Sequence, residues 1–145
     1  MHWAAHVAHL EADIERFPER YATRVGERGV TLSGGQRQRA SLGRALARRP
    51  AVLVLDDVLA SVDTQTEAAI LEKLAPVVRG RTTLLVSHRL STLHRADRIV
   101  VLDGGRIVQQ GTHEELAAKP GYYADTLRLQ QLEARAGADE GGGDA

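Results

Sequence analysis

Two short apolar runs, separated by a helical pattern, constrain the fold of this chain more than any other feature. The runs cover residues 51–55 and 82–87, a length typical of strands. Between them, residues 64–78 follow a helical pattern, with Asp63 or Thr64 as the N-cap. A strand, a helix and a second strand in this order predict a parallel α/β unit, in which each strand is buried on both faces.

Further helices and a hairpin are predicted around this unit. Asp103-Gly104-Gly105 lies between two short strand patterns and is typical of a hairpin turn. Thr112 and Glu115 have the spacing of a capping box, which predicts the start of another helix. Residues 134–145 include three consecutive glycines and lack the apolar content to fold, so we expect a disordered tail. The other predicted segments are helices at 3–16, 34–48, 91–95 and 121–133, and strands at 98–102 and 106–109.

Composition excludes several classes of protein. The 145 residues suit one modest domain, and 19 basic residues balance 19 acidic ones, which argues against a nucleic-acid partner. The absence of cysteine excludes disulfides and thiolate metal sites. No apolar run approaches the roughly 20 residues of a membrane helix, so we expect the chain itself to be soluble.

The run Leu32-Ser33-Gly34-Gly35-Gln36 is the first candidate for chemistry. Ser33 and Gln36 have capping-box spacing, so Ser33 is expected to cap the helix that follows. The start of a helix favours a phosphate, because its N–H groups are unpaired and its dipole is positive there. The two glycines let a ligand approach the backbone. An ordinary capped helix with a glycine-rich entry is the alternative for these residues alone.

Polar residues follow both predicted strands of the α/β unit. Asp56 and Asp57 follow the first strand, and Ser87 and His88 follow the second. In parallel sheets, chemistry is found at the carboxyl ends of the strands. An acid held there can bind Mg²⁺ directly or through water. The alternatives are that Asp56 caps a turn and that His88 is structural.

Taken together, these motifs resemble the ABC (ATP-binding cassette) ATPases. Residues 32–39 resemble the signature motif, 52–56 the Walker B motif, 60–63 the D-loop, and 87–89 the switch histidine. Residues 23–29 resemble the x-loop, which in that family is typical of exporters with fused membrane domains. The resemblance covers about residues 4–132 and implies the C-terminal part of a nucleotide-binding domain of P-loop NTPase fold. Residues 1–50 would be the remnant of its helical subdomain, and 51–133 the C-terminal part of its ATPase core.

The resemblance also implies roles for single residues. Ser33, Gly34, Gly35 and Gln36 would contact ATP held by a partner subunit, and Asp63 would couple the two sites. In the chain's own site, Asp56 would hold Mg²⁺, Asp57 would act as the catalytic base, and His88 would sense the γ-phosphate.

Two departures from the family pattern affect catalysis. The phosphate-binding run Gly-x-x-x-x-Gly-Lys-Ser/Thr does not occur in this sequence, whose only lysines are Lys73 and Lys119. Asp57 stands where most ABC ATPases have glutamate, and it is shorter by one methylene. A displacement of about 1 Å can change a rate by roughly 100-fold. The departure at Asp57 resembles the degenerate site of heterodimeric exporters, and the alternative is a family member that works adequately with Asp. From the missing run we expect that the chain alone neither binds ATP tightly nor hydrolyses it.

The resemblance thus favours part of an ABC exporter. Its partners would be a second nucleotide-binding domain and a transmembrane domain, at the cytoplasmic face of the membrane. One alternative is a non-enzymatic remnant or interaction module that docks on an intact ABC subunit. Another is a soluble ABC ATPase of DNA repair or translation, which the x-loop resemblance and the balanced charge disfavour.

Overall fold

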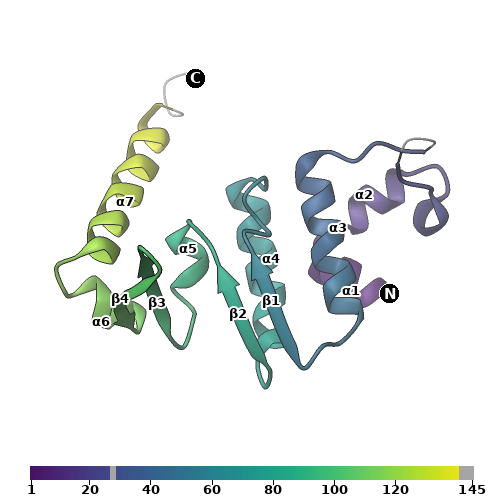
Figure 1. Ribbon diagram of the computed structural model, residues 1–145. Helices are drawn as coiled ribbons and strands as arrows, with labels where there is room; N and C mark the ends of the chain where they lie inside the picture. The colour runs from purple at the N-terminus through teal and green to yellow at the C-terminus, as the bar shows by residue number, and fades with distance from the viewer. Residues whose placement is uncertain (27–28, 141–145) are drawn as a thin grey trace. The chain divides into compact units, whose positions relative to one another are not determined.

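The computed structural model describes residues 1–26 and 29–140, and the chain divides into two compact units between His88 and Arg89. Figure 1 follows the elements of both units along the chain. The division differs from the predicted boundary at residue 50, because helices on both sides of that position share one apolar core. That residues 1–50 are the remnant of a helical subdomain stays a prediction.

The first unit contains the predicted parallel α/β arrangement. Its two strands pair in parallel, with Leu53 opposite Thr83 and Leu55 opposite Leu85. The helix between them begins at the predicted position, and Asp63 is its cap. The elements of this unit are α1 (His2–Val7), α2 (Glu11–Arg16), the 3₁₀ helix η1 (Arg20–Ala22), α3 (Gly34–Ala47), β1 (Val52–Asp56), α4 (Thr64–Val78) and β2 (Thr82–Val86).

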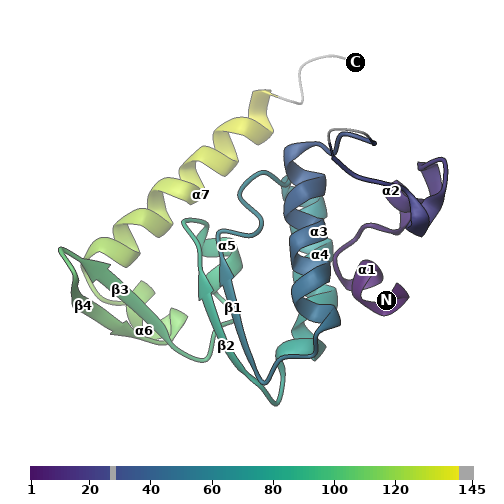
Figure 2. The same ribbon diagram turned by 45° about the vertical axis from the view of Figure 1, so that its right-hand side comes forward.

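Three helices and one face of β1 form the core of the first unit. Figures 1 and 2 show α4 running along the pair of strands. Apolar side chains that point inward from each element make one cluster, which excludes water and stabilises the unit. Its members include Ala4 and Ala8 of α1, Leu42 and Leu46 of α3, Leu53 and Leu55 of β1, and Ile70 and Leu74 of α4.

The prediction that both strands are buried on both faces is wrong for the described chain. Leu53 is 2% exposed, whereas Val54 beside it is 59% exposed. On β2, Leu84 and Val86 are exposed as well. The helices of the first unit pack only on the side of Leu53 and Leu55, and no described element of that unit covers the opposite face. Along β1, buried and exposed positions therefore alternate, and along β2 half-buried and exposed positions alternate.

The predicted helix at 3–16 is two short helices instead of one. His9 has a φ of 53°, a left-handed conformation that interrupts the helix. The N–H of Leu10 then donates to the carbonyl of Ala5 at 2.9 Å. The turn brings both Ala8 and Leu10 into the core, which compensates for the hydrogen bonds lost at the break.

The second unit contains the predicted hairpin. Gly104 and Gly105 both have positive φ angles, 52° and 74°, which suit the tight turn between the strands. The hairpin forms a separate two-stranded antiparallel sheet and does not extend the parallel pair. The capping box at Thr112 is confirmed. The elements are α5 (Leu90–Leu93), β3 (Ile99–Asp103), β4 (Arg106–Gly111), α6 (His113–Ala117) and α7 (Tyr122–Glu140).

The prediction that the disordered tail begins at residue 134 is wrong. Helix α7 continues to Glu140, so residues 134–140 are helical, and residues 141–145 lie outside the described part of the chain. Most of these positions are alanine, arginine or glutamate, and the intrinsic propensity of these residues favours a helix. No described helix has both the length and the apolar character to cross a membrane.

The one-sided burial of the strands predicts unequal effects of the same substitution. Leu55 is 1% exposed and Leu84 is 57% exposed. We expect Leu55→Ala to lower the free energy of unfolding by about 2–5 kcal/mol and Leu84→Ala by less than about 1 kcal/mol. Urea unfolding of the two variants measures both values. Equal losses would contradict an uncovered face on the strands.

Candidate functional site

The first turn of α3 has the predicted capping box. The N–H of Gln36 donates to Oγ of Ser33 at 3.2 Å, and the N–H of Ser33 donates to Oε1 of Gln36 at 2.9 Å. Ser33 is exposed, and Gly34 and Gly35 are half-buried. The first N–H groups of a helix lack partners within it, so this turn offers donors to an anion.

The glycines of the turn also have a structural reason. A Cβ on Gly35 would stand 2.8 Å from the carbonyl oxygen of Ser61, a distance that neither backbone could accommodate without moving. Gly34 lies beside the Ser61 side chain, at an ordinary contact distance of 3.7 Å for its added Cβ. Gly35 therefore permits a close backbone approach to the loop after β1, whether or not a ligand also uses it.

Gln38 joins the same turn to the loop that carries the candidate catalytic residues. Its Oε1 accepts from the N–H of Ser61 at 2.8 Å, and its Nε2 donates to the carbonyl of Asp57 at 3.4 Å. Gln38 lies in the predicted signature motif, but this role was not predicted for it. The available signal was its spacing, since it lies three and four residues after the two glycines and therefore on their face of the helix.

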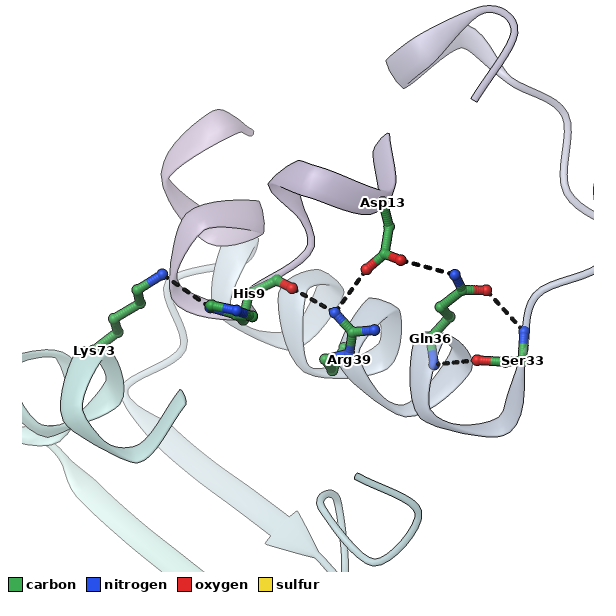
Figure 3. A network of polar contacts seen from close by, with 6 residues as sticks. All are labelled: His9, Asp13, Ser33, Gln36, Arg39 and Lys73. Carbon is green, nitrogen blue, oxygen red and sulfur yellow. Dashed lines mark hydrogen bonds and ion pairs between the residues drawn. The ribbon is translucent and has the colours of Figure 1, made fainter. Parts of the chain in front are cut away.

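A second network holds the turn from the side of α2 (Figure 3). Nε2 of Gln36 donates to Oδ1 of Asp13 at 2.8 Å, and a guanidinium nitrogen of Arg39 lies 2.7 Å from Oδ2 of the same carboxylate. Arg39 also donates to the carbonyl of His9. Asp13 was not predicted to belong to the site, because it lies more than 20 residues before its partners in the sequence. Arg39 lies in the predicted signature motif, but no role was predicted for it.

His9 connects this network to α4. Its Nδ1 lies 3.1 Å from Nζ of Lys73. Burial, then the charges of Lys73 and Arg39, hold the pKa of His9 below its ordinary value of 6.5. The neutral ring can therefore accept a hydrogen bond from the lysine at neutral pH.

The strand ends bring Asp57 and His88 together as predicted. Nε2 of His88 lies 3.3 Å from Oδ2 of Asp57, and the N–H of Asp57 donates to the carbonyl of Val86 at 2.9 Å. Asp57 has a φ of 46°, in the left-handed region that few residues other than glycine adopt. The His88 side chain is 90% exposed, so it is open to a ligand. Asp56 lies exposed at the end of β1.

Asp63 is the N-cap of α4. Its Oδ1 accepts from the N–H of Thr66 at 2.9 Å. The hydrogen bonds from the backbone and side chain of Thr66 hold the pKa of Asp63 below its ordinary value of 3.8. The cap interpretation is therefore confirmed, and the role of Asp63 between two subunits stays a prediction.

The described side chains could provide only part of the ligand set of Mg²⁺. Within residues 1–26 and 29–140, no group of three or more His, Cys, Asp or Glu side chains could hold a metal. Mg²⁺ in nucleotide sites takes one or two carboxylates, with phosphate oxygens and waters as the other ligands. Asp56 can provide one such oxygen, and the nucleotide would have to provide others.

Comparison with known proteins agrees with the motifs. A family model described as "ABC transporter" matches residues 4–60. The chain is 48% identical over 138 residues to the probable multidrug resistance ABC transporter ATP-binding/permease protein YheI of Bacillus subtilis (strain 168). It is 50% identical over 127 residues to the ATP-dependent lipid A-core flippase of Alkalilimnicola ehrlichii. These matches cover 95% and 88% of this chain, but only 23% and 22% of the two relatives.

A solved structure agrees over the same extent. The chain is 42% identical to a bacterial Atm1-family ABC exporter with ATP bound, with a TM-score of 0.82, over 88% of this chain and 23% of that one. The chain is therefore similar to ABC transporters, through a family model over residues 4–60 and through exporters that match most of its length. The predicted resemblance to ABC exporters and the predicted α/β fold class are both confirmed.

The structure does not test two parts of the predicted resemblance, the x-loop and the contacts with nucleotide. The x-loop prediction at residues 23–29 includes residues 27 and 28, which lie outside the described residues. The chain spans less than a quarter of the length of the two curated relatives and of the solved exporter. The signature, Walker B and D-loop residues lie in the first unit, as does the switch residue His88, and their contacts with nucleotide stay predictions.

The two hydrogen bonds of Gln38 predict a measurable effect on the neighbouring loop. We expect Gln38→Ala to accelerate exchange of the Ser61 amide hydrogen about tenfold, because its acceptor is removed. Amide exchange followed by NMR measures this rate. Gln131→Ala, an exposed position on α7, is the control. Unchanged protection of Ser61 would show that Gln38 does not hold the loop.

Proposed function

We propose that this chain serves as part of the nucleotide-binding domain of an ABC exporter and contributes its signature turn to ATP held mainly by a partner domain. The observation that carries the proposal is the capped first turn of α3, with Ser33 exposed, in a chain similar to ABC exporters. Ser33 keeps a hydroxyl hydrogen to donate while its oxygen accepts from Gln36. The N–H groups of Gly34 and Gly35 favour a phosphate oxygen in the same place.

The sequence supports a contribution to a partner's ATP over one to the chain's own ATP. The run Gly-x-x-x-x-Gly-Lys-Ser/Thr, whose backbone and lysine hold the β- and γ-phosphates, does not occur in this chain. A chain with a complete signature and without that run has more to offer a partner's nucleotide than its own. We therefore infer that the chain alone neither binds ATP tightly nor hydrolyses it.

The strand ends would serve the chain's own side of the paired sites. His88 would donate a hydrogen bond to the γ-phosphate, and Asp57 would orient the attacking water. Asp57 is already within hydrogen-bond distance of His88, so the two side chains would act together. Asp56 would hold Mg²⁺, which when bound neutralises charge on the phosphates. The short carboxylate of Asp57 makes this half of the pair the weaker catalyst.

We propose the transport function from the names of two relatives. One is named as an ATP-binding/permease protein and the other as an ATP-dependent flippase. We propose that two nucleotide-binding domains enclose ATP at the cytoplasmic face of a membrane and that Asp63 couples their sites. Residues 23–29 would contact the transmembrane domain. A non-enzymatic interaction module is the second candidate, and the absent phosphate-binding run favours it.

A chimera tests the proposal. The 138 matched residues of this chain replace the corresponding segment of the Bacillus subtilis relative, and ATP hydrolysis by the purified chimera is measured. We expect hydrolysis, and we expect Ser33→Ala to reduce it by about tenfold or more, since one transition-state donor is lost.

Thr112→Ala is the matched control for this substitution. Ser33 and Thr112 each cap a helix in a capping box, so both changes cost about 1 kcal/mol of stability. Only the first lies at the proposed nucleotide contact. Equal hydrolysis in the two variants would contradict a role for the signature turn. A folded chimera without any hydrolysis would favour the interaction module.

A further inference from the structure

We propose that Asp13 is a positioning residue that fixes the orientation of the Gln36 side-chain amide and thereby holds the signature turn. The contacts of Asp13 lie within the first unit and do not depend on the proposed function. Only their consequence for ATP binding by the signature turn rests on that function. Asp13 comes from α2, a helix that carries none of the predicted site residues.

The side-chain amide of Gln36 can lie in two orientations, and only one of them completes the capping box. Its Oε1 accepts from the N–H of Ser33 at 2.9 Å, which is one half of the capping box. If the amide turned by 180°, its NH₂ group would face the Ser33 N–H, and two donors would oppose each other. In that orientation the N–H of Ser33 loses its hydrogen-bond acceptor.

Asp13 removes the ambiguity from the other end of the amide. A carboxylate accepts hydrogen bonds and donates none, so it pairs only with the NH₂ group. Oδ1 of Asp13 lies 2.8 Å from Nε2 of Gln36, on the side away from Ser33. The carboxylate and the Ser33 N–H therefore select the same orientation of the amide.

Arg39 holds Asp13 in position for this task. The guanidinium lies 2.7 Å from Oδ2, and the two side chains are only 14% and 17% exposed. A partly buried pair is less screened by salt than a surface pair. Arg39 also donates to the carbonyl of His9, in the break between α1 and α2. The break that sequence reasoning missed is thus part of the support of the signature turn.

These contacts refine the role of Gln36. Its amide is oriented inside the chain before any nucleotide arrives, so Gln36 acts by holding Ser33 and the helix start. The groups directed to the partner's phosphate are then the Ser33 hydroxyl and the backbone N–H groups. A pre-oriented set of donors loses less entropy when the ligand binds.

Amide exchange of Ser33 in the full 145-residue chain tests the proposal without ATP, so it can fail independently of the proposed function. Gln36→Glu puts two carboxylates face to face, and we expect exchange of the Ser33 amide to rise about tenfold. Asp13→Asn combined with Gln36→Glu restores a donor opposite an acceptor, because the amide placed at position 13 donates to the new carboxylate. We expect the double variant to recover most of the protection.

A merely structural ion pair between Asp13 and Arg39 predicts the opposite result. Asp13→Asn breaks that pair, so the double variant would then protect Ser33 less than Gln36→Glu alone. Such an outcome would overturn the proposal, as would an unchanged Ser33 rate in Gln36→Glu. Asp125→Asn is the control, since it removes the carboxylate of an exposed pair with Arg128 in the second unit. It should leave the Ser33 rate unchanged.

Discussion

Hydrogen bonds near the start of α3 connect the signature turn to α2 and to the loop after β1. Ser33 and Gln36 close the turn, Asp13 holds it from α2, and Gln38 holds the loop that contains Asp57. Gly35 has no side chain, and this allows the loop to lie against the helix. The signature turn and the loop after β1, which contains Asp57, are therefore parts of one packed structure.

Local patterns were sufficient to predict much of this structure, and long-range contacts were not. Helix starts at Ser33 and Thr112 follow from capping boxes that span three residues, and the hairpin follows from two adjacent glycines. The contacts of Asp13 and Gln38 join residues 19 to 26 positions apart, where a single sequence gives no spacing to recognise. The exposed face of β1 was missed because an apolar run looks the same whether one face is covered or both.

The chain combines a well-formed signature turn with candidate residues of its own at the strand ends. Asp57 and His88 lie close together, but Asp57 is shorter than the glutamate of most ABC ATPases, and the phosphate-binding run does not occur in this sequence. Hydrogen bonds of Ser33, Gln36 and Gln38 hold the turn that we propose faces a partner. The account's central claim is that the chemistry of this chain serves ATP bound elsewhere.

Nucleotide titration tests that claim most directly. ATP is titrated into the 145-residue chain alone, and then into a mixture with a nucleotide-binding domain of the Bacillus subtilis relative, while binding and association are followed by calorimetry and sedimentation. The account predicts no micromolar binding by the chain alone, and an association with the second domain that requires ATP and is weakened by Ser33→Ala. Micromolar affinity of the isolated chain for ATP would contradict it.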